Sequence, residues 1–182
     1  SVWTDSTAAK QDMGDVVVNG TTKIINLGSG VKATNITIGA DDTLSVDNNY
    51  ALEVKGSFTN NNSFLAQNGT VTFTATGAGN TITAGSSSFY NLTFNGVGGN
   101  WSFVNSTLTI GNNFTVATGT VTMPTATTTI TGSFANTGGT FMHNNGTVSL
   151  TASTAKTIQT NSSSFYDLQL NGTGSWSFVD SH

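Results

Sequence analysis

The stretch SSSFYNLTFNGVGGNWSF at residues 86–103 occurs a second time, as SSSFYDLQLNGTGSWSF, at residues 162–178. The first copy begins at Ser86 and the second at Ser162, so the repeat has a period of roughly 76 residues. The duplication is longer than this stretch, because Gly56-Ser57-Phe58 also matches Gly132-Ser133-Phe134, with single-residue insertions and deletions in between. A repeat that tolerates such changes indicates a structural unit stacked beside the next one, not a single active site.

The composition is typical of an all-β protein. Charged residues make up 8% of the 182 residues, there is one proline, and there is no cysteine. Thr alternates with aliphatic residues in many short segments, which is the period-two pattern of β-strands. The lack of cysteine excludes disulfide bonds and thiolate metal sites. A net charge of −4 without any Arg argues against nucleic acid or an anionic membrane as a partner, and no stretch approaches the roughly 20 apolar residues of a membrane-spanning helix.

Aliphatic residues that we expect to face inward recur at a nearly regular spacing. Eight of them lie between positions 38 and 168, and the mean of the seven steps is about 19 residues, close to the periods of known repeat architectures. These anchors are Ile38, Val54, Val71, Leu92, Ile110, Ile130, Val148 and Leu168. This spacing predicts a parallel β-solenoid, in which each strand stacks about 4.8 Å above its predecessor. Four such steps span one long repeat, so we expect four turns in each. The alternative is a pair of β-sandwiches, one in each 76-residue block.

The chain divides into four parts on this basis. Residues 1–14 lie outside the repeat, and residues 15–55 form charged N-terminal strands or first turns. Residues 56–131 are the first repeat block, and residues 132–182 are an incomplete second block. No Asp, Glu, Lys or Arg occurs between residues 56 and 155, so a polar but uncharged surface is expected there.

The phrases SFYNLTFNG, WSF and STLTIGNNFTVATGTV resemble the Thr/Asn/Gly-rich repeats of large secreted microbial surface proteins. These adhesin-like and surface-layer-like proteins form parallel β-helices, and the resemblance covers about residues 35–182. It implies extracellular or cell-surface display and a structural or adhesive role. It brings no catalytic residues and no cofactor to this chain.

Few residues have the chemistry of a catalytic or metal site. Asp41, Asp42 and Asp47 are the one cluster of carboxylates, and a calcium site is the hypothesis they allow. Their spacing lacks the alternating ligands of an EF-hand loop, so capping of a turn is the competing interpretation. The two histidines are His143 and the C-terminal His182, and neither is placed beside a nucleophile and an acid. We therefore predict that the protein is not an enzyme.

Asn-x-Ser/Thr sequons are abundant, and glycans on them would supply the solubility that the uncharged stretch lacks. The eleven candidate glycosylation sites are Asn19, Asn35, Asn61, Asn68, Asn91, Asn100, Asn105, Asn113, Asn145, Asn161 and Asn171.

The two copies of the opening motif differ on their C-terminal sides. The first is followed by two further predicted strands, whereas the second is followed by four residues after Phe178. We expect the apolar side chains of the second copy, Leu168, Leu170, Trp176 and Phe178, to be left uncovered. A strand from another copy of the chain could cover them, and the candidate donors are Val2 with Trp3, or Val16, Val17 and Val18.

Three functions are compatible with these features. The first is a structural subunit of an extracellular filament or surface fibre, whose partners are further copies of the same chain joined head to tail. The second is a fragment of an adhesin or surface-layer β-helix, with surface carbohydrate as its partner. The third, a carbohydrate-active β-helix, is disfavoured because no catalytic carboxylate cluster with a basic partner is evident.

Overall fold

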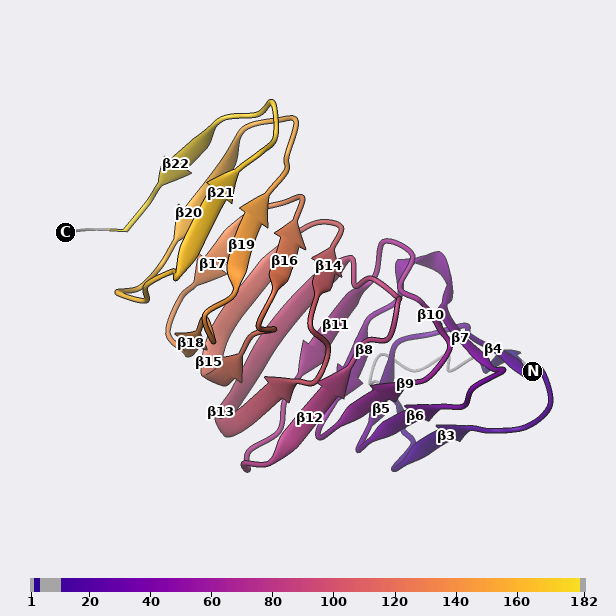
Figure 1. The fold of residues 1–182 in the computed structure, drawn as a ribbon. Coiled ribbons are helices and arrows are strands. Elements are labelled where there is room, and N and C mark those ends of the chain that lie inside the picture. The colour runs from indigo at the N-terminus through magenta and orange to yellow at the C-terminus, as the bar shows by residue number, and fades with distance from the viewer. Residues whose placement is uncertain (1, 4–10, 181–182) are drawn as a thin grey trace.

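The computed structural model describes residues 2–3 and 11–180, and it forms a parallel β-solenoid of about eight turns. Figure 1 shows the strands stacked in chain order along one axis, with the N-terminal strands at one end and the C-terminal strands at the other. Every strand pair among the described residues is parallel, including the pairs β3 (Val16–Val18) with β6 (Ile36–Ile38) and β16 (Thr127–Ile130) with β19 (Thr147–Leu150). The predicted solenoid is therefore confirmed, and the tandem sandwich, which needs antiparallel strands, is wrong.

The strands pair in three columns, and most turns of the chain contribute a strand to all three. The first column contains β1 (Val2–Trp3), β4 (Ile24–Leu27), β7 (Thr43–Val46), β10 (Ser63–Leu65), β14 (Leu108–Ile110), β16, β19 and β21 (Asp167–Leu170). The second contains β2 (Gln11–Asp12), β5 (Val31–Ala33), β8 (Leu52–Val54), β11 (Thr70–Phe73), the first halves of β13 (Asn91–Phe103) and β15 (Phe114–Thr122), β17 (Phe134–Asn136), β20 (Lys156–Gln159) and β22 (Trp176–Phe178). The third contains β3, β6, β9 (Phe58–Asn60), β12 (Asn80–Thr83), the second halves of β13 and β15, and β18 (Thr140–Met142). A single 3-10 turn, η1 (Asp47–Asn49), follows β7.

Apolar side chains fill the narrow interior of the solenoid. Along each strand they alternate with Thr, Ser and Asn side chains that point outward. Phe73, Phe94, Phe114 and Phe134 are fully buried in the second column. Their ring centroids lie 5.3 Å (Phe73 to Phe94), 6.0 Å (Phe94 to Phe114) and 5.4 Å (Phe114 to Phe134) apart in successive turns. Stacked, tilted and edge-to-face aromatic pairs at these distances add to the stabilisation from burial alone. Phe73 and Phe94 are register partners, as are Phe114 and Phe134, whereas Phe94 pairs with Val116 and packs diagonally on Phe114.

Each turn contains more residues than the spacing of the anchors predicts. In the second column, Val31, Leu52, Val71, Leu92, Phe114, Phe134, Ile158 and Phe178 stack in register. The seven steps from Val31 to Phe178 average about 21 residues per turn, which lies within the usual range of structural repeats. The anchors do not all lie in one column: Ile38 lies in the third, Val54 in the second and Leu168 in the first. Where successive anchors lie in different columns, the chain between them makes less than a full turn, so the mean spacing of the anchors is shorter than one turn. Inward aliphatic residues look alike in all three columns, so the sequence pattern does not separate them.

The 76-residue repeat does not fill a whole number of turns. Starting at Leu52 in the second column, the chain makes three turns, through Val71 and Leu92 to Phe114. It then passes through the third column and reaches Thr128, the counterpart of Leu52, in the first column. The repeat is thus three and two-thirds turns, and the expectation of four turns is wrong. Every strand of the second copy lies one column away from its counterpart in the first.

Polar side chains at the corners bridge successive turns. At each step a corner oxygen accepts a hydrogen bond from the backbone N–H of the residue one turn later. In one ladder the backbone N–H of Asn35 donates to Asp15 Oδ1 at 3.2 Å, that of Ser57 to Asn35 Oδ1 at 2.8 Å, and that of Thr81 to Ser57 Oγ at 3.0 Å. In the other ladder the backbone N–H of Asn113 donates to Asn91 Oδ1 at 3.3 Å, that of Ser133 to Asn113 Oδ1 at 2.9 Å, and that of Thr157 to Ser133 Oγ at 3.1 Å. These ladders satisfy backbone donors where the chain turns and the β-ladder is interrupted.

Successive turns of the backbone lie very close together at Gly96, at the corner inside β13. A methyl group at this position would overlap the carbonyl oxygen of Ala75 in the preceding turn, and the same holds for the counterpart Gly172 against Ala152. We expect Gly96→Ala to destabilise the protein by about 1–3 kcal/mol or more, because backbone must move to make room. Gly77→Ala is the matched control, since no atom lies within 4 Å of its added methyl group. The urea midpoints of the two variants measure the difference, and equal midpoints would contradict the close packing of the corner.

Candidate functional site

The middle serine of the duplicated motif is held by a buried asparagine. Asn60, which is 1% exposed, donates from Nδ2 to the carbonyl oxygen of Ala84 at 2.8 Å and to Ser87 Oγ at 3.0 Å. The backbone N–H of Phe64 donates to the same Ser87 oxygen at 2.9 Å. In the second copy Asn136, 0% exposed, donates to Ser163 Oγ at 2.8 Å. The SSS turn is therefore anchored to the core in both copies.

The first copy of this turn interrupts the first column. The column is split into two four-stranded sheets, one ending at β10 and the other beginning at β14. Between them a single residue of the motif, Phe89, forms a bridge to Ile110. Because a turn stands where a strand would continue the sheet, a cavity of about 410 Å³ opens between β10 and β14. We call it the SSSFY crevice.

The crevice has an apolar floor and a polar rim. Phe64 and Phe89 form the buried floor, with ring centroids 5.7 Å apart. The rim carries exposed Gln67, Ser86 and Ser88. Half-exposed Tyr90 and exposed Leu65 complete it.

The second copy makes an incomplete version of the crevice, one column away. Phe141 and Phe165 repeat the floor, with centroids 5.8 Å apart. Tyr166, the counterpart of Tyr90, is 65% exposed and lies 5.7 Å from the ring of His143. His143 is itself fixed, because its Nδ1 accepts a hydrogen bond from the backbone N–H of Asn145 at 3.0 Å. No strand among the described residues stands in the place that β14 takes in the first copy.

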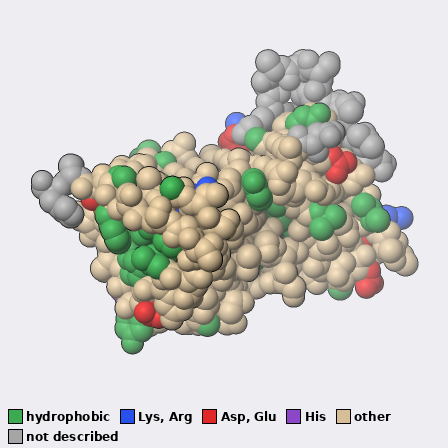
Figure 2. All heavy atoms as spheres, turned by 90° about the horizontal axis from the view of Figure 1, so that it is seen from above, with side chains coloured by type: hydrophobic (Ala, Val, Ile, Leu, Met, Phe, Trp, Pro, Cys, Tyr) green, Lys and Arg blue, Asp and Glu red, His purple; other side chains and the backbone are tan. Residues whose placement is uncertain are grey.

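The last turn leaves apolar side chains exposed, and the first copy shows what covering does to them. Leu170 is 50% exposed, whereas its counterpart Phe94 is 0% exposed. Phe178 is 59% exposed, and its counterpart Phe103 is 7% exposed. We call β21 and β22, with the exposed Tyr166, Leu170, Phe178 and Val179, the C-terminal surface. Figure 2 shows hydrophobic side chains gathered at this end of the molecule.

Both segments expected to donate a strand already belong to the first turn. Val2–Trp3 is β1 and pairs with β4, and Val16–Val18 is β3 and pairs with β6. The remaining residues of the predicted N-terminal extension include 4–10, which lie outside the described residues. Of the four apolar residues expected to be uncovered, Leu170 and Phe178 are exposed, while Leu168 and Trp176 are partly buried against the core.

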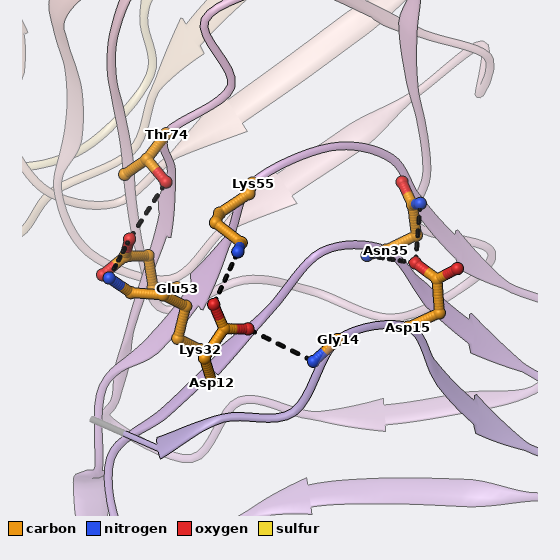
Figure 3. Close-up of polar contacts among 8 residues, drawn as sticks. All are labelled: Asp12, Gly14, Asp15, Lys32, Asn35, Glu53, Lys55 and Thr74. Carbon is orange, nitrogen blue, oxygen red and sulfur yellow. Dashed lines mark hydrogen bonds and ion pairs between the residues drawn. The ribbon is translucent and has the colours of Figure 1, made fainter.

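A group of charged side chains lies on the outer side of the second column in the first turns, as Figure 3 shows. Lys55 Nζ lies 2.6 Å from Asp12 Oδ2, and Lys32 Nζ lies 3.2 Å from Glu53 Oε1. Thr74 Oγ1 also donates to Glu53 Oε1, at 3.1 Å. The residues come from successive turns, and both ion pairs are partly exposed, so their contribution to stability is small.

Hydrogen bonds to the Asp12 carboxylate change its acidity. The bond from Lys55 and the weaker one from the backbone N–H of Gly14 hold the pKa of Asp12 below its ordinary value. These charges pair with one another and do not converge on a cleft. The cluster is therefore best explained as a surface ladder, not as a catalytic centre.

The three aspartates of the predicted calcium site lie in different environments. Asp41 is exposed on the turn before β7, and Asp47 accepts a hydrogen bond from Ser45 Oγ at 2.8 Å. Asp42 is 1% exposed and accepts the backbone N–H of Lys23 at 2.7 Å through Oδ1. Within the described part of the chain, no three His, Cys, Asp or Glu side chains are grouped so that they could hold a metal ion.

The eleven sequon asparagines differ in how free their amide groups are. Asn35, Asn105 and Asn171 donate from Nδ2 to other groups of the chain, and the Oδ1 atoms of Asn91 and Asn113 accept corner hydrogen bonds. Asn100 is half-buried. Five are exposed and make no side-chain hydrogen bond within the described residues: Asn19, Asn61, Asn68, Asn145 and Asn161.

Comparison with protein-family models, curated protein sequences and solved structures finds no match to this chain. Across residues 2–3 and 11–180 there is no helix of the length and hydrophobicity needed to cross a bilayer. The geometry of the solenoid itself is therefore the guide to function.

The anchoring of the SSS turn can be tested at Asn60. We expect Asn60→Ala to destabilise the protein by about 1–3 kcal/mol, because the buried Ala84 carbonyl and the Ser87 hydroxyl lose their donor. Asn136→Ala should behave in the same way, whereas Asn61→Ala, at the exposed neighbouring position, should stay within about 0.5 kcal/mol of the parent protein. Urea unfolding provides the comparison. If Asn60→Ala unfolds at the same urea concentration as Asn61→Ala, the turn does not depend on this contact.

The Asp12–Lys55 pair predicts a local pH dependence. Because the folded-state pKa of Asp12 is lowered, the pair's stabilising effect is present above the ordinary aspartate pKa and is lost as the pH falls through the folded value. An NMR titration of the Asp12 carboxyl carbon should show a midpoint that rises in Lys55→Gln and does not change in Lys156→Gln. An unchanged midpoint in Lys55→Gln would mean that the ion pair does not form in solution.

Proposed function

We propose that the protein is a structural subunit that stacks end to end into an extracellular fibre, with the first turn of one copy covering the C-terminal surface of another. The observation that carries this proposal is the contrast between equivalent side chains. Phe94 and Phe103 are buried under the next turn, whereas Leu170 and Phe178 are about half exposed. Complete burial of a Leu or Phe side chain contributes about 1.5–3 kcal/mol, so covering these two half-exposed side chains contributes about that amount in total.

Unpaired strand edges support the same proposal. β21 is the last strand of its sheet, and β22 is paired with β20 on one side alone. The backbone N–H and C=O groups on the open side of each strand are a template for a further parallel strand. A second copy can satisfy them without any change of fold.

The first and last described strands of the solenoid occupy matching columns. The first described strands, β1, β2 and β3, lie in the first, second and third columns, and the last described strands, β21 and β22, lie in the first and second. A following copy would place β1 over β21 and β2 over β22. Both ends are also apolar, since Met13, Val16 and Ile25 at one end, and Phe165, Leu168 and Trp176 at the other, are incompletely buried.

This arrangement differs from donor-strand exchange in what must move. Donation of Val2–Trp3 or Val16–Val18 would require β1 or β3 to leave its own partner, β4 or β6. Docking of an intact first turn keeps those pairs. We therefore propose stacking of whole turns, and the resulting contact is head to tail and can propagate without limit.

Display outside the cell remains part of the proposal. The uncharged stretch from residue 56 to residue 155 gives a fibre little electrostatic protection from other chains. Glycans at Asn61, Asn68 or Asn145 would provide that protection away from both ends, whereas the exposed sequon positions Asn19 and Asn161 lie in the first and last turns.

The alternative is a surface-repeat or adhesin segment that does not self-associate, and sedimentation distinguishes it. We expect the parent protein to form concentration-dependent polymers visible by electron microscopy, and Leu170→Lys/Phe178→Lys to remain at the monomer mass of 18.7 kDa. The matched control is Val97→Lys/Val104→Lys, which changes exposed valines in the middle of the solenoid. It should polymerise like the parent. A parent protein that stays monomeric at high concentration would contradict the proposal and favour the alternative.

A further inference from the structure

We propose that the SSSFY crevice between β10 and β14 is a binding site for a neutral carbohydrate. The crevice lies in the middle of the chain, away from the C-terminal surface, so this inference does not depend on end-to-end stacking. Its volume of about 410 Å³ falls within the range of small-molecule sites, about 300–1,000 Å³.

Three backbone groups at the crevice already have hydrogen-bond partners within the chain. On the β10 side, the N–H of Phe64 donates to Ser87 Oγ at 2.9 Å. On the β14 side, the N–H of Phe89 donates to the Thr109 carbonyl at 3.1 Å, and the Phe89 carbonyl accepts from Gly111 at 2.8 Å. A peptide therefore does not find two open strand edges here. The site offers side chains instead.

Those side chains combine an aromatic surface with hydroxyl and amide groups. Tyr90 stands at the rim, its backbone carbonyl fixed by the N–H of Asn112 at 2.9 Å and its ring beside Gly111. Ser86, Ser88 and Gln67 are exposed, and within the described residues their side chains make no hydrogen bond. A sugar ring has both an apolar C–H face and a rim of hydroxyl groups, and it matches this combination.

The absence of charge selects a neutral ligand. No Asp, Glu, Lys or Arg occurs between residues 56 and 155, and that stretch supplies every residue of the crevice. A carboxylated or sulfated sugar would have to give up hydration without gaining an ion pair. A neutral oligosaccharide gives up less hydration on binding and keeps its hydrogen bonds.

The second copy provides an internal control. Its Ser162, Ser164 and Tyr166 repeat the rim, but no described strand lies next to this turn as β14 lies next to the first, where Ile110 bridges to Phe89. Tyr166 is accordingly 65% exposed. In a single copy of the chain, one crevice is complete and the other is open.

Saturation-transfer NMR with cellotriose, mannotriose and chitotriose tests the site. At least one of the three should bind with a dissociation constant of about 1 mM or lower. Tyr90→Ala and Ser86→Ala/Ser88→Ala should each weaken that binding by about tenfold or more. Tyr166→Ala and Ser162→Ala/Ser164→Ala, the same changes in the open copy, should leave it unchanged.

Three results would overturn the proposal. The first is no transfer from any of the three sugars, and the second is equal transfer in the parent and Tyr90→Ala proteins. The third is tighter binding of trigalacturonate, an acidic trisaccharide, than of any neutral one. Gln67→Ala, at an exposed rim position, gives a second test if Tyr90→Ala does not fold, and it should also weaken binding. Measurement on Leu170→Lys/Phe178→Lys separates loss of sugar binding from loss of assembly, because the crevice is intact in that variant.

Discussion

Each turn of this solenoid completes its hydrogen bonds and its apolar packing on the turns before and after it, and the rest of the structure depends on this constraint. Leu52 pairs with Val31 on one side and Val71 on the other, and its side chain is buried as a result. The core is too narrow for a turn to bury its own side chains alone. A turn with a neighbour on one side only therefore keeps both exposed apolar groups and unpaired backbone.

The same constraint explains how a duplication of three and two-thirds turns can be accommodated. What a strand needs is a neighbour in register, and all three columns supply one. Phe58 lies in the third column and its counterpart Phe134 in the second, yet both are fully buried. The columns are thus nearly interchangeable as environments for inward residues. A consequence is that the SSS turn occurs in the first column in one copy and in the third column in the other.

Sequence reasoning predicts the features that repeat along the chain and misses those that depend on which turn lies next to which. The nearly regular spacing of the eight anchors, Val54, Val71 and Leu92 among them, predicts a solenoid. It does not reveal that Ile38 and Leu168 belong to other columns, because the pattern of inward aliphatic residues is the same in each. The SSSFY crevice depends on the contact of Asn60 with Ser87, 27 residues away, and on a missing strand beside β10. Neither is visible as a motif. Likewise, the side-chain partners of Asn105 and Asn171 could not be read from their sequons.

Charge is sparse both in the middle of the solenoid and at the C-terminal surface. Between residues 56 and 155 most strands are covered on both sides by the chain's own turns, although β10, β14 and β18 each pair with a strand on one side alone. At the C-terminal surface the edges are open, yet neither β21 nor β22 contains a Lys or a Pro. The nearest carboxylates are also engaged: Asp167 accepts from Thr147 at 3.0 Å, and Asp180 accepts from the backbone of Thr160 and Asn161. The surface therefore combines exposed apolar side chains with open edges and lacks the residues that usually oppose association. Such a surface favours a further parallel turn over solvent.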